Sequence, residues 1–278
     1  MPTPPPAADR FHGSAPEAAK AWLLIEHPGP WPAFDLPADL PRSLTEYSAE
    51  ALKHGVRTQL IRRTDRLGRS GTDEWERSGD GTVENGPEAA EEARRARTDG
   101  PWARRPLRVL LAGGPAGSRW LVRLEPPALP ELSKVDPARF LDPAPPLPGS
   151  REEAALLVCT HGRREVCCAR YGRPVARALA AEFGPLVWET THVGGDEFAA
   201  NLVVLPAAAY FGRLLPSEAV DLARRALAGD LDVEHYRGTA GQPVPVQAAD
   251  CLLRRTFGHG AEPAAASAAV TAGWARPV

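Results

Sequence analysis

Residues 156–198 read LLVCTHGRREVCCARYGRPVARALAAEFGPLVWETTHVGGDEF. Two largely apolar runs, 154–160 and 186–192, flank residues 173–184, whose composition and closing glycine are typical of a helix beginning near Pro174. The pattern predicts a buried strand, a helix and a second buried strand. In such a β-α-β unit the two strands are parallel neighbours, so the residues that follow each strand are expected at the same edge of the sheet.

The residue types at that edge predict a metal-cluster site. Cys159 ends the first strand, Cys168 precedes the helix, and His192 follows the second strand. Three of the chain's four cysteines lie in this stretch, which packing alone does not require. Thiolates and imidazole suit iron–sulfur clusters or zinc. Gly194 and Gly195 would let the backbone approach a bulky cofactor.

Composition argues against several classes of protein. A net charge of -2 and a pI near 6.4 give no overall positive field for nucleic acid or an anionic membrane. The sequence has neither a signal peptide pattern nor a run of about 18 apolar residues. Few cysteines, two of them adjacent at 167 and 168, make a poor disulfide framework. We expect a cytoplasmic protein that binds neither nucleic acid nor membrane.

The element pattern predicts an α/β fold with two thioredoxin-like domains, related by internal duplication. Each half reads as strand, helix and three further strands. The N-terminal, degenerate domain is predicted over residues 19–148, with a low-order insertion at 66–105, and the C-terminal domain over 149–260. Residues 1–18 are expected to form a flexible arm and residues 261–278 a tail.

Four motifs distributed along the chain are more specific together than any one alone. They are LLIEHPGPW at 23–31, CTHGRREVCCARYGRPVA at 159–176, VWETTHVGGDEFAANLVVLP at 187–206, and YRG with VQAAD within 236–250. In these motifs the sequence resembles the sucrase/ferredoxin-like proteins of actinobacteria, which are related to fungal thioredoxin-like 2Fe–2S proteins. The resemblance spans most of the chain.

The resemblance implies that the C-terminal domain holds a 2Fe–2S cluster. In the fungal members two cysteines and two histidines of an HxGGH motif are the ligands. The cysteines match Cys159 and Cys168, and the first histidine matches His192. Asp196 stands where the second histidine would be, and a carboxylate can also ligate iron. The implied ligand set is therefore Cys159, Cys168, His192 and Asp196.

Several neighbouring residues are expected to support this site. Cys167 and Cys251 are alternative fourth ligands. His161, Cys167, Gly194 and Gly195 are expected to lie next to the ligands without binding the metal.

These features predict an electron-transfer protein rather than an enzyme, acting with a redox partner protein that the sequence does not identify. No paired carboxylates at glycosidase spacing support a sucrase activity. Two alternatives stay open. One is a thiol–disulfide redox protein or sensor in which Cys159 and Cys168 cycle between dithiol and disulfide. The other is a degenerate member of the family without a cofactor.

Overall fold

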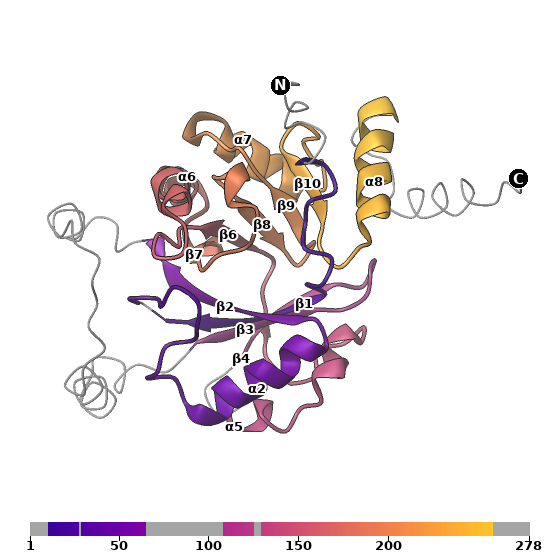
Figure 1. Cartoon of the computed structure of the whole chain (residues 1–278). Helices are drawn as coiled ribbons and strands as arrows, with labels where there is room; N and C mark the ends of the chain where they lie inside the picture. The colour runs from indigo at the N-terminus through magenta and orange to yellow at the C-terminus, as the bar shows by residue number, and fades with distance from the viewer. Residues whose placement is uncertain (1–10, 28, 65–107, 125–128, 258–278) are drawn as a thin grey trace, which may run out of the picture.

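The computed structural model describes residues 11–27, 29–64, 108–124 and 129–257 (Figure 1). Within these residues it is a mixed α/β protein whose strands form one continuous sheet, in the order β10-β9-β8-β6-β7-β2-β1-β3-β4-β5. The strands are β1 (Ala21–Glu26), β2 (Val56–Arg63), β3 (Val109–Gly113), β4 (Trp120–Leu124), β5 (Ser150–Arg151), β6 (Ala155–Cys159), β7 (Val187–Thr190), β8 (Leu202–Leu205), β9 (Ala209–Phe211) and β10 (Tyr236–Thr239). The helices are α2 (Arg42–Lys53), α5 (Leu129–Leu132), α6 (Val166–Phe183), α7 (Pro216–Leu227) and α8 (Val244–Phe257), with 3-10 turns η3 (Pro137–Leu141), η4 (Gly184–Leu186) and η5 (Asp196–Phe198).

The two halves of the sheet repeat one strand arrangement. In the first half β1 pairs with β2 in parallel and with β3 antiparallel, and β3 pairs with β4. In the second half β6 pairs with β7 in parallel and with β8 antiparallel, and β8 pairs with β9. Antiparallel pairing of β2 with β7 joins the halves. A shared strand order does not by itself establish a common origin, so the internal duplication and the domain boundaries stay predictions.

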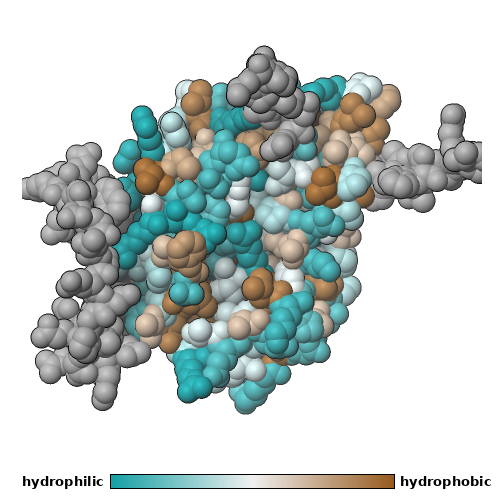
Figure 2. Space-filling view, in the orientation of Figure 1, coloured by the Kyte–Doolittle hydropathy of each residue, from teal (hydrophilic) through white to brown (hydrophobic). Residues whose placement is uncertain are grey.

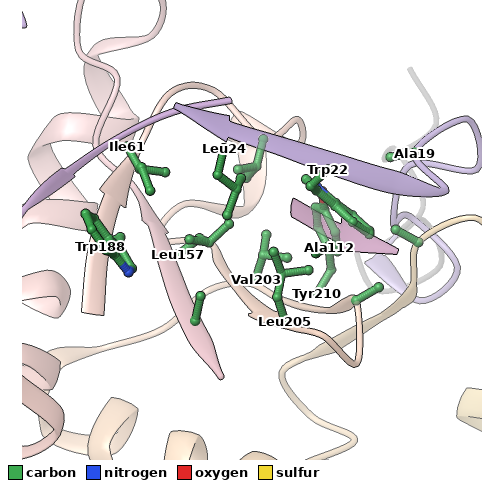
Figure 3. Packing of buried hydrophobic residues seen from close by; sticks show 14 of the residues in the cluster. Ala19, Trp22, Leu24, Ile61, Ala112, Leu157, Trp188, Val203, Leu205 and Tyr210 are labelled. Atoms are coloured by element: carbon green, nitrogen blue, oxygen red, sulfur yellow. The ribbon is translucent and has the colours of Figure 1, made fainter. Parts of the chain in front are cut away.

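The sheet curls so that its two halves face each other across a common core (Figure 1). Successive side chains of a strand point to opposite faces. In β1, Trp22 and Leu24 therefore enter the core between the halves, whereas Leu23 and Ile25 pack in the core that includes residues of α2. Figure 3 shows the common core, where Trp22 and Leu24 lie with Leu157 from the second half.

The same alternation fixes the environment of Cys159. Leu157 and Cys159 belong to the core between the halves, while Leu156 and Val158 pack in a separate core with residues of α6 and α7. The first half of the chain therefore contributes to the surroundings of the Cys159 thiol.

Helix α6 begins at Val166, so the prediction that it begins near Pro174 is wrong. Pro174 lies inside the helix, where it has no N–H to donate to the preceding turn. Gly172 and Val175 are buried, and we attribute the continued helix to this packing, which offsets the missing hydrogen bond. Cys168 therefore lies in the first turn of a helix rather than in a loop.

Part of the N-terminal segment packs against the second half of the chain. Phe11 and Ala15 are buried. Gln247 of α8 accepts a hydrogen bond from the backbone N–H of Ala15 (3.1 Å) and donates one to its carbonyl oxygen (3.1 Å). The predicted insertion at 66–105, the predicted tail at 261–278 and residues 1–10 of the predicted arm lie outside the described residues.

The described helices and the surface in Figure 2 differ from those of a membrane-spanning protein. None of them combines the length and the apolar character that crossing a bilayer requires. On the face drawn in Figure 2, hydrophilic residues cover most of the surface and hydrophobic residues form small separate groups.

Candidate metal centre

Two thiols and one imidazole converge where β6, α6 and β7 meet. The Sγ atoms of Cys159 and Cys168 and a ring nitrogen of His192 all lie within 4.8 Å of one another. Nδ1 of His192 is 3.7 Å from Sγ of Cys168. Both cysteines are 1% exposed, whereas the His192 side chain is 15% exposed. The imidazole is therefore the part of this group that reaches the surface.

The topology explains why these residues meet. Strands β6 and β7 are parallel neighbours, with Cys159 opposite Thr190 in the register. Cys159 ends β6 and His192 follows β7 by two residues, so both lie at the same edge of the sheet. The first turn of α6 brings Cys168 to this edge. The sequence-based prediction that the two loops meet is confirmed.

The two thiols behave as a pair that shares one proton. A hydrogen bond from Cys168 holds the pKa of Cys159 well below its usual range, although burial of the thiol opposes this. Hydrogen bonds from His192 and from the backbone N–H groups of His161 and Val193 lower the pKa of Cys159 further. The pKa of Cys168 is raised by the same interaction with Cys159 and by burial. Of the two, Cys159 is therefore the thiol that loses its proton more readily.

His161 supports the site with both of its ring nitrogens. Its Nδ1 accepts a hydrogen bond from the backbone N–H of His192 (3.2 Å), so its Nε2 carries the proton and donates to the carbonyl oxygen of Pro32 (2.9 Å). The ring of Trp31 packs edge-on against it. Burial lowers the pKa of His161, which favours this neutral form. His161 therefore lies beside the ligand-type residues and links the segment at 31–32 to them.

The turn after β7 needs glycine at Gly195. Gly194 and Gly195 have φ values of +91° and +72°, in the region that favours glycine. A Cβ atom at Gly195 would overlap the guanidinium of Arg237. The close approach predicted for these glycines is thus made by an arginine of the chain itself.

Asp196 lies on the other side of the His192 ring from the thiols. Its Oδ1 is 3.9 Å from Nε2 of His192, and its side chain is 41% exposed. Nδ1 is the ring nitrogen near Cys168. The structure therefore does not bring the Asp196 carboxylate into the group formed by Cys159, Cys168 and His192.

The other two cysteines occupy different places. The Cys167 thiol is half-buried, donates to the carbonyl oxygen of Asp196 (3.4 Å) and interacts with the Cys168 thiol. Cys251 is buried in the core that packs against α6 and α7, where its thiol is 3.9 Å from the carbonyl oxygen of Tyr236. Of these two thiols, the structure brings Cys167 beside the site and leaves Cys251 in a different core.

An ion pair with a buried carboxylate supports the strand ends. Glu189 of β7 is 1% exposed and accepts hydrogen bonds from Nε and Nη2 of Arg62 (2.9 and 2.5 Å) and from the hydroxyl of Thr160 (2.7 Å). The Arg62 guanidinium also stacks over Trp31, 4.3 Å from the ring centroid. Thr160 follows Cys159 directly, so this pair ties β2 and β7 to the residue after the buried thiolate.

Sequence reasoning missed the residues that hold the turn after β7. Three of them lie on the distant strands β2 and β10, and the fourth directly precedes β8. These residues are Arg57, Gln59, Asn201 and Arg237. Arg237 lies within the YRG motif and Asn201 within the motif at 187–206, but neither motif indicates what these side chains bind.

The donor set fits a soft-metal centre. Two thiolates and one imidazole suit iron–sulfur clusters and zinc. A 2Fe–2S cluster takes four protein ligands, two on each iron. The side chains of Cys159, Cys168 and His192 fit three of these positions, and Cys167 and Asp196 lie next to them.

Comparison with known proteins gives the family of this chain. The sequence profile described as sucrase/ferredoxin-like matches residues 16–238, most of the chain. A solved thioredoxin-like [2Fe–2S] ferredoxin from Aquifex aeolicus is 20% identical, and the match covers 32% of this chain and 94% of that chain with a TM-score of 0.28. No curated protein matches the sequence. On the extent of the profile match, this chain belongs to the sucrase/ferredoxin-like family.

Proposed function

We propose that this chain is an electron-transfer protein that holds a 2Fe–2S cluster where β6, α6 and β7 meet. The observation that carries the proposal is the convergence of Cys159, Cys168 and His192 within 4.8 Å. Membership of a family whose description includes ferredoxin supports it. The cytoplasmic location and the absence of an enzymatic activity remain parts of this proposal.

The side chains have distinct tasks in this proposal. When bound, the cluster would supply one-electron chemistry. Cys159 already favours the thiolate form, while Cys168 holds the shared proton and would release it on ligation. His192 would bind as the neutral imidazole. Replacing thiolate ligands by histidine raises the reduction potential, so we expect a value above about -400 mV.

Two side chains beside the three donors can complete the ligand set. Asp196 faces Nε2 of His192, which suits a carboxylate that orients a histidine ligand. The Cys167 thiol lies beside the site and interacts with that of Cys168, and sulfur is a softer ligand than a carboxylate, which favours Cys167 as the fourth ligand. We assign ligation to Cys167 and orientation of His192 to Asp196, in place of the Asp196 ligand implied by the family resemblance.

The redox partner would approach the exposed edge of His192. The Cys159 and Cys168 thiols are 1% exposed and the imidazole is 15% exposed, so this ring links the two buried thiols to the surface. We propose that another redox protein docks over it, with no part for nucleic acid or membrane.

A spectroscopic experiment tests the proposal. The protein is produced with iron and sulfide, and visible and EPR spectra are recorded before and after reduction. We expect an oxidised visible spectrum and a reduced EPR signal that are lost in Cys159→Ser, Cys168→Ser and His192→Ala and kept in Cys251→Ser. Wild-type protein that is colourless after reconstitution would refute the cluster.

The shared proton of Cys159 and Cys168 also favours a second candidate, a thiol–disulfide redox protein. The Cys159 thiolate would attack a disulfide-bearing partner, and the Cys168 thiol would then displace the partner. The chain would end as a Cys159–Cys168 disulfide. Its two electrons and the one shared proton would leave on the partner's two sulfurs, and the second partner thiolate would take its proton from solvent. A reversible loss of 2 Da in metal-free protein, seen by mass spectrometry, would support this candidate; thiols that stay reduced in a disulfide buffer would exclude it.

A further inference from the structure

Two side chains of β2 hold the backbone that carries His192. Arg57 donates to the carbonyl oxygens of His192 (2.8 Å) and Val193 (3.0 Å). Gln59 donates to the same His192 oxygen (3.2 Å). Among the described residues, both hydrogen bonds of the Arg57 guanidinium go to this turn. The first half of the chain thus fixes the position of a ligand-type residue in the second half.

The next two carbonyl groups are held from the other side of the molecule. Arg237 of β10 donates to the carbonyl oxygen of Gly194 (3.0 Å) and to Oδ1 of Asn201 (2.8 Å). Asn201 in turn donates to the carbonyl oxygen of Gly195 (2.7 Å). Four consecutive carbonyl groups, from His192 to Gly195, therefore accept hydrogen bonds from side chains, and two of the donors are arginines.

The amide side of this turn faces the thiolate. The backbone N–H of Val193 donates to Cys159, and so does that of His161. The carbonyl oxygens of the turn accept hydrogen bonds from the two guanidinium groups, and its Val193 N–H donates to the sulfur of Cys159. These bonds hold the turn in one orientation toward Cys159. N–H groups near sulfur stabilise its negative charge, so a turn held in this orientation favours metal binding by the Cys159 thiolate.

Both guanidinium groups also act on the thiolate through their charge. Arg237 is 1% exposed and interacts electrostatically with Cys159 and with Arg57. The buried phenol of Tyr210 interacts with the same three groups. The buried Arg237 and the half-buried Arg57 thus both lie near the thiolate, where charges are screened less than in water. A positive charge there favours the more reduced, more negative state of a bound centre.

We propose that Arg57 and Arg237 are the positioning residues of the metal centre, holding the turn from His192 to Gly195 toward Cys159 and raising the reduction potential. The effect on potential rests on the proposed 2Fe–2S function, whereas the positioning of the turn is a property of the chain alone. Arg237 also binds Ser14 through its Oγ atom and its carbonyl oxygen. Its replacement would loosen the N-terminal segment as well, so Arg57 gives the cleaner test.

The test compares Arg57→Met, Arg57→Lys and the control Arg119→Met. Arg119 is also partly buried and donates to two backbone carbonyl groups, those of Lys20 (3.3 Å) and Ala240 (3.5 Å). Hydrogen exchange of the amides at 193–195 is measured in metal-free protein, and the reduction potential is measured in the iron–sulfur form.

We expect exchange in Arg57→Met to be roughly tenfold faster than in wild type, because a hydrogen bond to a charged donor is lost on each of two carbonyl groups. The potential of Arg57→Met should be lower than that of wild type. Arg57→Lys should have a reduction potential close to that of wild type, because lysine keeps the positive charge. It should restore only part of the protection from exchange, because an ammonium group cannot replace the guanidinium that donates to two carbonyl groups. Arg119→Met should change neither quantity.

The positioning role and the effect on reduction potential can be refuted separately. Exchange at 193–195 that is no faster in Arg57→Met than in Arg119→Met would overturn the positioning role. Equal potentials in wild type, Arg57→Met and Arg57→Lys would overturn the electrostatic role. Wild-type protein that takes up no cluster would refute the proposed function, and exchange in metal-free protein would still decide the positioning role.

Discussion

The contact between α6 and β6 gives the sharpest structural prediction, for Gly172→Ala. Gly172 is buried on α6, one turn after Cys168. A Cβ atom at this position would overlap the carbonyl oxygen of Cys159 and lie 3.1 Å from its carbonyl carbon. Because non-bonded carbon atoms sit about 3.5–4.0 Å apart, the helix must move away from the strand by about 1 Å. That movement separates Cys159 from Cys168.

The change in the free energy of unfolding of Gly172→Ala is the sum of two opposing effects. Overpacking costs up to about 3 kcal/mol, and the upper end applies because the neighbour is backbone that cannot rotate away. Alanine in a helix regains about 1 kcal/mol relative to glycine. The net loss in the free energy of unfolding is therefore about 2 kcal/mol, or a fall in Tm of about 4 °C for a chain of this size. Displaced ligands should weaken metal binding by about 10- to 100-fold.

Thermal unfolding and a competitive Zn²⁺ titration against a chelator measure these two effects. Gly229→Ala is the control, because it adds the same methyl group where nothing lies within 4 Å. Its φ of +83° costs about 1 kcal/mol, but the change should leave Zn²⁺ affinity at the wild-type value. If Gly172→Ala binds Zn²⁺ as tightly as wild type, the proposed dependence of the site on the α6–β6 contact is wrong.

Four further substitutions test the surroundings of the centre. Glu189→Gln should lower the free energy of unfolding by about 3 kcal/mol, measured by denaturant titration, because it leaves the guanidinium of Arg62 without its buried carboxylate. Asp196→Asn should keep iron bound and raise the reduction potential, while Cys167→Ser should lose iron; the reverse pattern in iron analysis would make Asp196 the ligand. Burial raises the pKa of Cys251 to about 12. The unfolded thiol ionises near pH 8.5, so the folded state binds more protons above that pH, and the free energy of unfolding should fall from about pH 9 to 12. Cys251→Ala should reduce this fall, and an unchanged pH dependence would contradict the raised pKa.

Most of the strand pattern and the convergence of the ligand-type residues could be predicted from the sequence; the short strands β5 and β10, which follow no apolar run, could not. Alternating and continuous apolar runs indicated the strands, and the β-α-β order placed Cys159 and His192 at one edge. These predictions depend on local patterns and on a general rule of parallel sheets. They needed no knowledge of distant contacts.

The start of α6 and the role of Asp196 depended on tertiary packing. Pro174 has the local signature of a helix start, but packing of buried residues such as Gly172 and Val175 carries the helix through it. The HVGGD motif places Asp196 near His192 but does not determine which ring nitrogen faces the thiols. That choice depends on the surrounding backbone.

Apart from the YRG motif around Arg237, the arginines that hold the turn had no sequence signal, because their partners are far away in the chain. Arg57 reaches carbonyl groups 135 and 136 residues later, and Arg237 reaches back 43 residues to Gly194. Their function becomes visible only when the two halves of the sheet face each other.

The iron and acid-labile sulfide content of freshly purified protein tests the central claim most directly. We predict two iron atoms and two sulfides per chain, the composition of a 2Fe–2S cluster. Both should be lost in Cys159→Ser and kept in Cys251→Ser. Protein that contains zinc in place of iron, or neither iron nor sulfide after reconstitution, would contradict the account.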